Sequence, residues 1–440
     1  MQLPAIAMTD LSGADGAGVV AAALPASREA RRGRGWLGGL GALVALYFFI
    51  AAINMMSGGL KTAATVAEVA EAMKAVFKLT DNPLAGLCVG ILVTSVVQSS
   101  SFTTTFTVGL VAAGQIELGP AIPIIMGANI GTSVTNILVS LAHVRRRVEF
   151  RRSLGGAIVH DLFNVLSVAL LMPLEWQWQI VSGPAEAFAK WLGGVTLITT
   201  DPGKYNFVKV AVSPIADGAK YVLGEVCGFG AATVGLTMAA VGIVLLFLAL
   251  FCLVKILRGL LKERLAGLFS RTLFAHPAIS FLVGIGTTAA VQSSSVTTSL
   301  VVPLVGAGVL KIRQIYPYTL GANIGTTVTA LIGGLAIAAT MAGADGQAAQ
   351  TIAPAALAVA FGHLLFNLYG TAVFWPLQWI PISLAKGYAS LAARRRLLAA
   401  VYIIVIFFLL PILTIVLVNT EEFMRLFSGA TGEATTAPVQ

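Results

Sequence analysis

Residues 97–105 read VQSSSFTTT, and residues 291–299 read VQSSSVTTS. Both runs contain the sequence Gln-Ser-Ser-Ser, and each lies inside an apolar stretch of a chain that is 57% hydrophobic. Hydroxyl and amide groups are costly in apolar surroundings unless they find partners. A polar run that occurs twice in such a chain therefore indicates a duplicated polar site inside an apolar protein.

The composition is that of a membrane protein. Only 11% of the 440 residues are charged, and the mean hydropathy is +0.88, whereas soluble domains carry about 25% charged residues. Stretches long enough for the roughly 20 apolar residues of a transmembrane helix include 37–60, 228–254 and 397–418. We therefore expect an all-α polytopic integral membrane protein, surrounded by the lipid bilayer.

The formal charge of +9 does not indicate a nucleic-acid partner. The basic residues fall in short clusters between apolar stretches, at 28–34, 145–152, 255–271 and 394–396, as the positive-inside rule describes. The cysteines have no metal-ligand or disulfide spacing; they are Cys88, Cys227 and Cys252. We expect no organic cofactor.

The chain contains two copies of one unit. An offset of 194 positions maps Gln98 onto Gln292, and GANIGTSVT at 127–135 onto GANIGTTVT at 321–329. HDLFN at 160–164 matches HLLFN at 363–367 with an offset of 203, which places nine inserted residues near 341–350. The predicted organisation is a cytoplasmic N-terminal tail (1–36), transport repeat 1 (37–176), an inter-repeat loop with an interfacial helix (177–229), transport repeat 2 (230–379), and an extra transmembrane helix with a tail (380–440).

The second copy is predicted to be inverted. Three full spans separate the two polar runs, at 121–142, 153–173 and 229–254, and an odd number of spans turns the second copy over. The same count places the N-terminus in the cytoplasm and the C-terminus outside. Internal repeats of this kind are typical of transporters, whose site lies where the copies meet.

Each Gln-Ser-Ser-Ser run is predicted at the tip of a re-entrant helical hairpin. The apolar stretch before the first run, Leu84 to Val97, has about 14 residues, which is too short for a full span. The GANIGT segments are predicted to be broken helices, because glycine and asparagine weaken a helix. Alternatively, their glycines allow close helix packing through the spacing of Gly127 and Gly131, and of Gly321 and Gly325.

Broken helices offer N–H groups to an anion, and carbonyls and hydroxyls to a cation such as Na⁺. A lone serine in a membrane helix usually bonds its own backbone or a neighbouring helix, but the grouping and duplication here favour a binding site. No arginine or lysine lies in these runs, so a bound anion could be released when Na⁺ leaves. The predicted substrate-binding residues are Gln98, Ser99, Ser100, Ser101, Gln292, Ser293, Ser294, Ser295, Asn129 and Asn323.

Asp161 lies inside the apolar segment 153–171, and its counterpart in the second copy is Leu364. An intramembrane carboxylate indicates a functional site. Asn164, three residues later on the same helix face, would allow both side chains to bind one cation. The alternative is a structural pair with His160 or with an arginine of 145–152. His160 and His363 are either proton relays or neutral histidines in a packed polar core.

The paired QSSS runs, the paired GANIGT segments and HDLFN resemble the type II sodium/phosphate cotransporters, in particular their bacterial members, over 37–379. The resemblance implies that the two QSSS runs face each other around inorganic phosphate and co-transported Na⁺, and that Asp161 holds an additional Na⁺. It also implies a bacterial inner-membrane location and a homodimer. The implied Na⁺ ligands are Asp161, Asn164, Thr132, Thr326, Thr327, Gln292 and Ser294.

Two features depart from that family. Its animal members have a long outer loop with several cysteines, whereas this loop has only Cys227, and the family places both termini inside. Three other functions are considered: a Na⁺-coupled transporter of a dicarboxylate or an amino acid, a channel without Na⁺ dependence, and a membrane enzyme. A serine enzyme is disfavoured because the chain has no GxSxG elbow.

Overall fold

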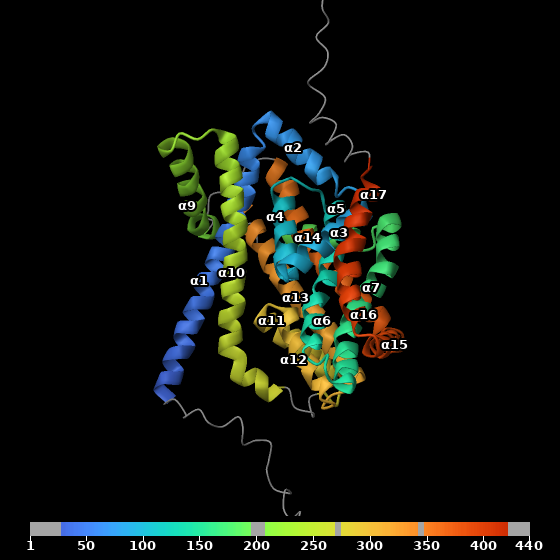
Figure 1. Cartoon of the computed structure of the whole chain (residues 1–440). Helices are drawn as coiled ribbons and strands as arrows, with labels where there is room; N and C mark the ends of the chain where they lie inside the picture. The colour runs from blue at the N-terminus through green and yellow to red at the C-terminus, as the bar shows by residue number, and fades with distance from the viewer. Residues whose placement is uncertain (1–27, 195–206, 269–273, 342–346, 421–440) are drawn as a thin grey trace, which may run out of the picture.

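The computed structural model describes residues 28–194, 207–268, 274–341 and 347–420, and every regular element in these ranges is helical (Figure 1). Within these ranges, seven helical segments are long and apolar enough to cross a membrane. The prediction of an all-α polytopic membrane protein is confirmed. The seven segments are Trp36–Ala63, Leu118–Leu141, Arg147–Trp178, Ala231–Leu260, Ile312–Thr340, Ile352–Phe374 and Leu397–Val418.

Most helices of the first half have a counterpart, in the same order, in the described second half of the chain. The first half contains α1 (Arg28–Ala63), α2 (Ala67–Lys78), α3 (Pro83–Val97), α4 (Ser100–Ala112), α5 (Leu118–Gly131), α6 (Ser133–Leu141), α7 (Arg147–Trp178) and α8 (Ser182–Gly194). Between the halves lie α9 (Phe207–Tyr221) and the π-helical segment η1 (Val222–Val226). The second half contains α10 (Ala231–Leu268), α11 (Pro277–Val291), α12 (Ser294–Gly306), α13 (Ile312–Met341), α14 (Gln347–Phe374) and α15 (Trp379–Arg394). A last span consists of α16 (Leu397–Ile404), η2 (Val405–Leu409) and α17 (Leu410–Val418).

The ends of the described chain lie at opposite ends of the molecule. Helix α1 begins at the lower end in Figure 1, and α17 ends near the upper end. This agrees with an odd number of spans. Which side of the membrane each end occupies stays a prediction.

Each polar run forms the turn of a helical hairpin. Helix α3 begins at Pro83 after Asn82, whose side chain accepts a hydrogen bond from the Leu84 N–H at 2.9 Å. It ends because Gln98 adopts a left-handed conformation with φ of 60°, and Gln292 does the same after α11 with φ of 61°. The two hairpins have the same helix bounds at an offset of 194. Their re-entrant insertion stays a prediction.

The predicted break at the GANIGT segments is absent in the second copy and limited to one residue in the first. Helix α13 continues through Gly321 and Gly325. In the first copy only Thr132 interrupts the helix, and its N–H still donates to the Ala128 carbonyl at 3.2 Å. A Cβ atom at Gly127 would lie 1.9 Å from the Leu87 carbonyl oxygen. The glycines therefore serve the alternative role of letting α5 pack directly against α3, and α13 against α11.

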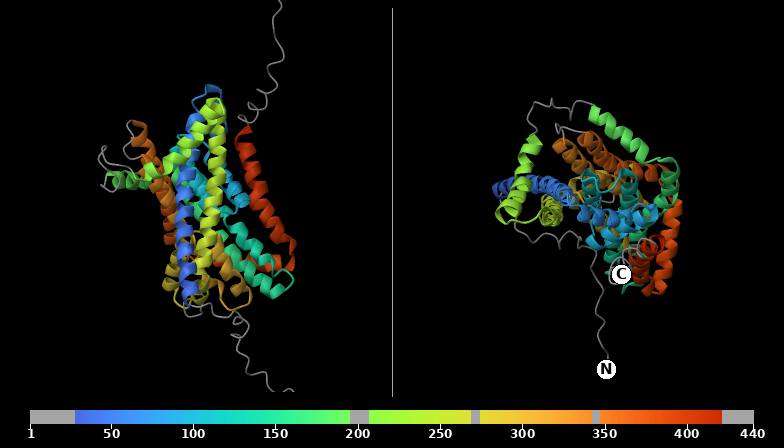
Figure 2. Two further views of the ribbon diagram at one scale, coloured as in Figure 1. Left: turned by 90° about the vertical axis from the view of Figure 1, so that its left-hand side faces the viewer. Right: turned by 90° about the horizontal axis from the view of Figure 1, so that it is seen from above.

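The remaining helices pack in pairs that cross the halves. Helix α8 packs on α14 of the other half, and α15 packs on α7. Helices α1 and α10 pack against each other and stand to one side of the hairpins with α9 (Figures 1 and 2). Glycines allow their close contact, since a Cβ at Gly242 would lie 2.6 Å from the Met56 nitrogen.

Candidate functional site

The tips of the two hairpins meet near the middle of the molecule, the first hairpin from the upper half and the second from the lower half (Figure 1). The Ser101 hydroxyl donates to the Gln292 carbonyl at 3.3 Å and lies 3.5 Å from the Thr329 hydroxyl. Helices α4 and α12 both begin at these tips. Their free N–H groups and partial positive charge are therefore directed at the junction of the two copies.

The glutamines hold the tips in shape. The side-chain oxygen of Gln292 accepts from Thr329 at 2.6 Å, and its side-chain nitrogen donates to the Ala289 carbonyl at 2.5 Å. Gln98 makes the equivalent bonds, to Thr135 at 2.6 Å and to the Ser95 carbonyl. Because both ends of each amide are occupied, these predicted substrate ligands position the tips in this structure.

The six tip serines divide into three groups. Ser99 and Ser293 cap α4 and α12, accepting from the N–H groups of Phe102 at 3.2 Å and Val296 at 3.4 Å. Ser101 bridges the two tips, as described above. The third group makes no side-chain hydrogen bond to any other described residue, although its members are buried; it comprises Ser100, Ser294 and Ser295. These hydroxyls are available to a ligand.

The predicted ligands Asn129 and Asn323 belong to a buried network that joins the two copies. The Asn323 side chain lies 2.5 Å from His160 Nε2 and donates to Asn164 Oδ1 at 2.7 Å. Asn164 in turn donates to the Asn129 carbonyl at 2.9 Å. The Asn129 side chain donates to the Ile125 carbonyl at 3.0 Å. Both asparagines thus have protein partners.

The two histidines differ in their surroundings. His160 has a partner at each ring nitrogen, because Asn136 lies 3.2 Å from Nδ1. His363 Nε2 lies 3.4 Å from Asn129 Oδ1, but its Nδ1 has no partner among the described residues. The residue that matches Asn136 in the second copy is Ala330. The packed-core interpretation therefore fits His160 better than His363.

Asp161 is fully buried in α7, and one of its oxygens accepts a hydrogen bond from the Tyr402 hydroxyl of α16. Its other oxygen, Oδ1, completes no hydrogen bond with a described residue, and neither does the hydroxyl of the neighbouring Ser133. The proposed structural pairs with His160 or with an arginine of 145–152 are not formed among the described residues. Tyr402 was missed, because it lies 241 positions away in the chain.

Asp161 and Asn164 do not converge on one ligand in this structure. Asn164 is bonded to Asn129 and Asn323 on α5 and α13, whereas Asp161 is bonded to α16. Residues three apart on a helix point about 60° apart, which is enough here to direct them at different neighbours. The predicted shared cation site is therefore not assembled in this structure.

The predicted threonine ligands of Na⁺ all donate to carbonyls of their own helices. Thr132 donates to Ala128 at 3.0 Å, Thr326 to Ala322 at 3.0 Å and Thr327 to Ile324 at 2.7 Å. Such bonds use the hydroxyl hydrogen and leave the oxygen lone pairs free. These residues could therefore still offer oxygen atoms to a cation.

A cavity of about 520 Å³ adjoins the tips. Its lining contains tip residues from both hairpins, including Ser99, Ser101 and Ser293, and residues of α10. Two cations of α10, Lys255 and Arg258, also line it. The sequence indicates these two only as part of a basic cluster between apolar stretches, because no local pattern shows which side chains of α10 line a cavity with the tips.

Comparison with known proteins supports one family. The family model described as Na⁺/Pi-cotransporter matches residues 48–172 and 244–373, which lie in the two copies. The chain is 34% identical over 433 residues to the sodium-dependent phosphate transport protein 2A of Rattus norvegicus, covering 84% of this chain and 66% of that protein. It is 32% identical over 430 residues to protein 2B of Homo sapiens, covering 79% of this chain and 60% of that protein.

A third relative, the 2A protein of Ovis aries, is 33% identical over 416 residues and is covered to 63%. The chain thus spans less than two thirds of the length of these relatives, which range from 60% to 66% covered. No solved structure matches the chain.

Proposed function

This chain belongs to the Na⁺/Pi-cotransporter family, and from that membership we propose that it carries inorganic phosphate across the membrane together with Na⁺. The observation that supports this most directly is the meeting of the two tips. There the N-termini of α4 and α12 lie at the junction of the copies, and the hydroxyls of three largely buried serines have no described partner. Backbone N–H groups and hydroxyls are the donors that an oxyanion needs.

We propose that Ser100, Ser294 and Ser295 donate directly to the phosphate oxygens. Gln98, Gln292, Ser99 and Ser293 then act one step away, because their side chains hold the turns and cap the helices. Asn129 and Asn323 join α5 and α13 to α7 through their hydrogen bonds with Asn164.

Na⁺ supplies the positive charge that the tips lack. We propose one Na⁺ at Asp161, whose free Oδ1 and the adjacent free Ser133 hydroxyl are oxygen ligands of the kind that hard cations bind. Asn164 is left out of this site because its side chain is bonded elsewhere. A phosphate affinity that falls when Na⁺ leaves provides the coupling between the two fluxes.

The family is one of transporters, and the chain is an integral, multi-pass membrane protein. The bacterial inner membrane as its location, the homodimer, and Thr132, Thr326 and Thr327 as further Na⁺ ligands stay predictions. Transport without chemical conversion of phosphate is part of the proposal.

Phosphate uptake by the purified protein in proteoliposomes tests the function. We expect radiolabelled phosphate to accumulate when an inward Na⁺ gradient is imposed, and not when K⁺ replaces Na⁺. Unlabelled phosphate should compete, and succinate should not. Accumulation that succinate abolishes would favour the dicarboxylate alternative, and flux that is independent of Na⁺ would indicate a channel.

A further inference from the structure

Two cations of α10 share a cavity with the tip serines. Lys255 and Arg258 line the cavity of about 520 Å³ that also contacts Ser99, Ser101 and Ser293. Neither cation forms an ion pair with a described acidic residue. Lys255 Nζ lies 5.9 Å from the centre of the Phe251 ring, which leaves its charge available to an anion.

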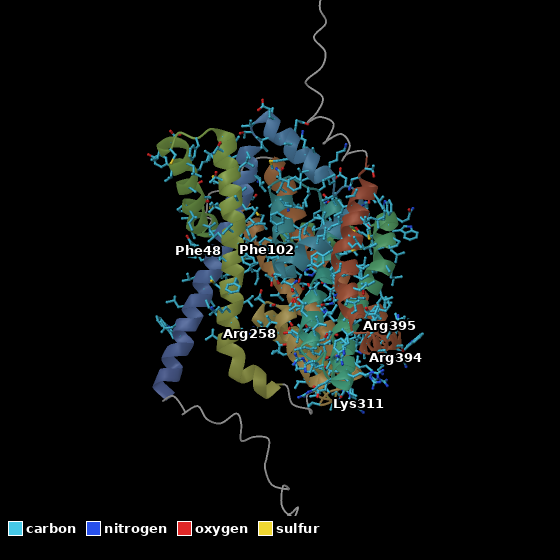
Figure 3. All side chains as sticks on the ribbon, viewed as in Figure 1. Phe48, Phe102, Arg258, Lys311, Arg394 and Arg395 are labelled. Atoms are coloured by element: carbon cyan, nitrogen blue, oxygen red, sulfur yellow. The ribbon has the colours of Figure 1, made fainter. Side chains whose placement is uncertain are left out.

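The cavity extends from the tips toward one end of the molecule. Phe102 and Arg258 both line it, and Figure 3 shows Phe102 near mid-height and Arg258 lower on α10. Lys311, Arg394 and Arg395 lie at the same lower end (Figure 3). We call this end the basic face; the positive-inside rule predicts it to be cytoplasmic.

The first copy carries a matching lysine. The offset of 194 that relates the two polar runs also maps Lys61 onto Lys255, and Gly41 onto Gly235. Lys61 lies in the last turn of α1, at the opposite end of the molecule from the basic face (Figure 1). It lines a separate, smaller cavity of about 160 Å³ with Ser57 and Thr340, and no tip residue contacts that cavity.

We propose that Lys61 and Lys255, the latter with Arg258, form two repeat-related subsites for inorganic phosphate, one at each mouth of the transport path. The proposal rests on the proposed function. Lys255 and Arg258 hold phosphate that leaves the tips toward the basic face, and Lys61 holds phosphate that arrives at the other face. In this structure the cavity of Lys255 and Arg258 contacts the tips, and the cavity of Lys61 does not.

The charge arrangement fits this role. Cations in a cleft with apolar walls concentrate anions and speed their association. Lys255 and Arg258 are exposed, so they remain hydrated and bind phosphate weakly. They also lie outside the tips, where a fixed cation in contact with phosphate would oppose release. In this proposal the cations attract phosphate to the mouths of the path, whereas the hydroxyls and helix N-termini of the tips bind it specifically.

The test compares the two faces. Phosphate uptake is measured in right-side-out and inverted vesicles from a host that lacks other phosphate transporters. In Lys255→Gln and Arg258→Gln, we expect the KM for phosphate presented at the basic face to rise about 3- to 10-fold, and the KM at the opposite face to stay unchanged. Lys61→Gln should show the reverse pattern. Added salt should reduce the difference in KM between the wild type and these variants.

Lys311→Gln is the matched control, because it removes a positive charge from the basic face but does not line the cavity. It should leave both KM values unchanged, and Lys255→Arg should retain most of the wild-type KM. Equal KM changes at both faces, no change at either face, or the same effect in Lys311→Gln would overturn the proposal.

A phospholipid headgroup carries the same phosphate chemistry and is tested separately. The purified variants are compared in liposomes of phosphatidylcholine alone and with an added anionic lipid. The proposal requires the Lys255→Gln effect in both. An effect seen only with anionic lipid would assign these cations to lipid and overturn it. Failure of the wild type to show any Na⁺-dependent phosphate flux would instead refute the proposed function.

Discussion

Gln98 and Gln292 adopt left-handed backbone angles, which residues other than glycine rarely adopt. Their side-chain amides explain why glutamine is found here. A left-handed residue costs of order 1 kcal/mol or more, and a glycine would avoid this cost. Glutamine, however, makes two hydrogen bonds from the same position, one to a threonine of the neighbouring helix. The strain is therefore offset, and the turn is fixed to the helix that follows the hairpin.

The tip serines carry the first prediction. Replacing Ser100 or Ser294 with alanine should remove about one hydrogen bond to a charged ligand, roughly 1.5 to 3 kcal/mol. Uptake at low phosphate should fall about 10- to 150-fold, as measured in proteoliposomes. Ser299→Ala is the control, because the Ser299 hydroxyl donates to the Val296 carbonyl of its own helix at 2.8 Å. Wild-type kinetics in both tip variants would exclude these serines as ligands.

Asp161 carries the second prediction. Asp161→Asn keeps the size of the side chain but removes its charge, and with it the proposed Na⁺. The variant should still transport phosphate, with about one less positive charge moved per phosphate and a weaker dependence on Na⁺. Currents from solid-supported membranes, scaled to phosphate flux, measure this.

Leu364→Asp should not restore the coupling in that variant, because Leu364 lies in the other copy and has a different place relative to Ser133. Lower pH should act in the wild type as the substitution does, since a proton on Asp161 also removes its charge. Identical charge per phosphate in wild type and variant would make Asp161 a structural residue.

At this scale the sequence indicates which residues are unusual but not which residues they contact. Asp161 stands out because it is charged inside an apolar segment. Its bond to Tyr402 depends on how α16 packs against α7, and no local pattern encodes that packing. The same applies to Lys255, which the sequence associates with loop orientation and which in the structure lines a cavity that the tips also line.

Among the elements, the hairpins were predictable, whereas the continuity of the second GANIGT helix was not. The hairpins follow from length, because a half of about 14 apolar residues cannot span a bilayer. The sequence allows two roles for the GANIGT glycines, a weakened helix or close helix packing, and the propensity of a single helix does not decide between them. In the structure each glycine faces the backbone of a partner helix, and close packing outweighs the weak propensity.

Gly127 and Gly119 in α5 provide the third prediction. A Cβ at Gly127 would lie 1.9 Å from the Leu87 carbonyl oxygen, whereas a Cβ at Gly119 would have nothing within 4 Å. Gly127→Ala should force α3 and α5 apart and destabilise the protein by about 1 to 3 kcal/mol or more. Gly119→Ala should be neutral or slightly stabilising. Thermal unfolding in detergent measures both, and equal melting temperatures would contradict the close contact.

The whole molecule combines a symmetric frame with asymmetric chemistry. In each half of the chain, the helix that follows the copy packs on the other half, as α8 on α14 and α15 on α7 show. Against this frame, Asp161 is matched by Leu364, and Asn136 by Ala330. Both copies can contribute equivalent residues to a substrate site at the two tips. A cation held by Asp161 has no equivalent in the second copy, because Leu364 stands there.

Inversion of the second copy gives the last prediction. Glu117 and Lys311 are related by the offset of 194, and both are exposed. Glu117 shares a cavity with Lys74 and Lys78 of α2 at the upper end, whereas Lys311 lies at the lower end (Figures 1 and 3). Cysteines introduced at these positions, after replacement of Cys88, Cys227 and Cys252, should therefore lie on opposite sides of the membrane.

In sealed right-side-out vesicles an impermeant thiol reagent should label Glu117→Cys and leave Lys311→Cys unmodified until the vesicles are opened. The positive-inside rule sets this direction, because the basic clusters gather at the Lys311 end. The reverse order would invert the assignment of sides but preserve the inverted repeats. Labelling of both positions in intact vesicles would contradict the inversion itself, and with it the meeting of the two tips from opposite faces.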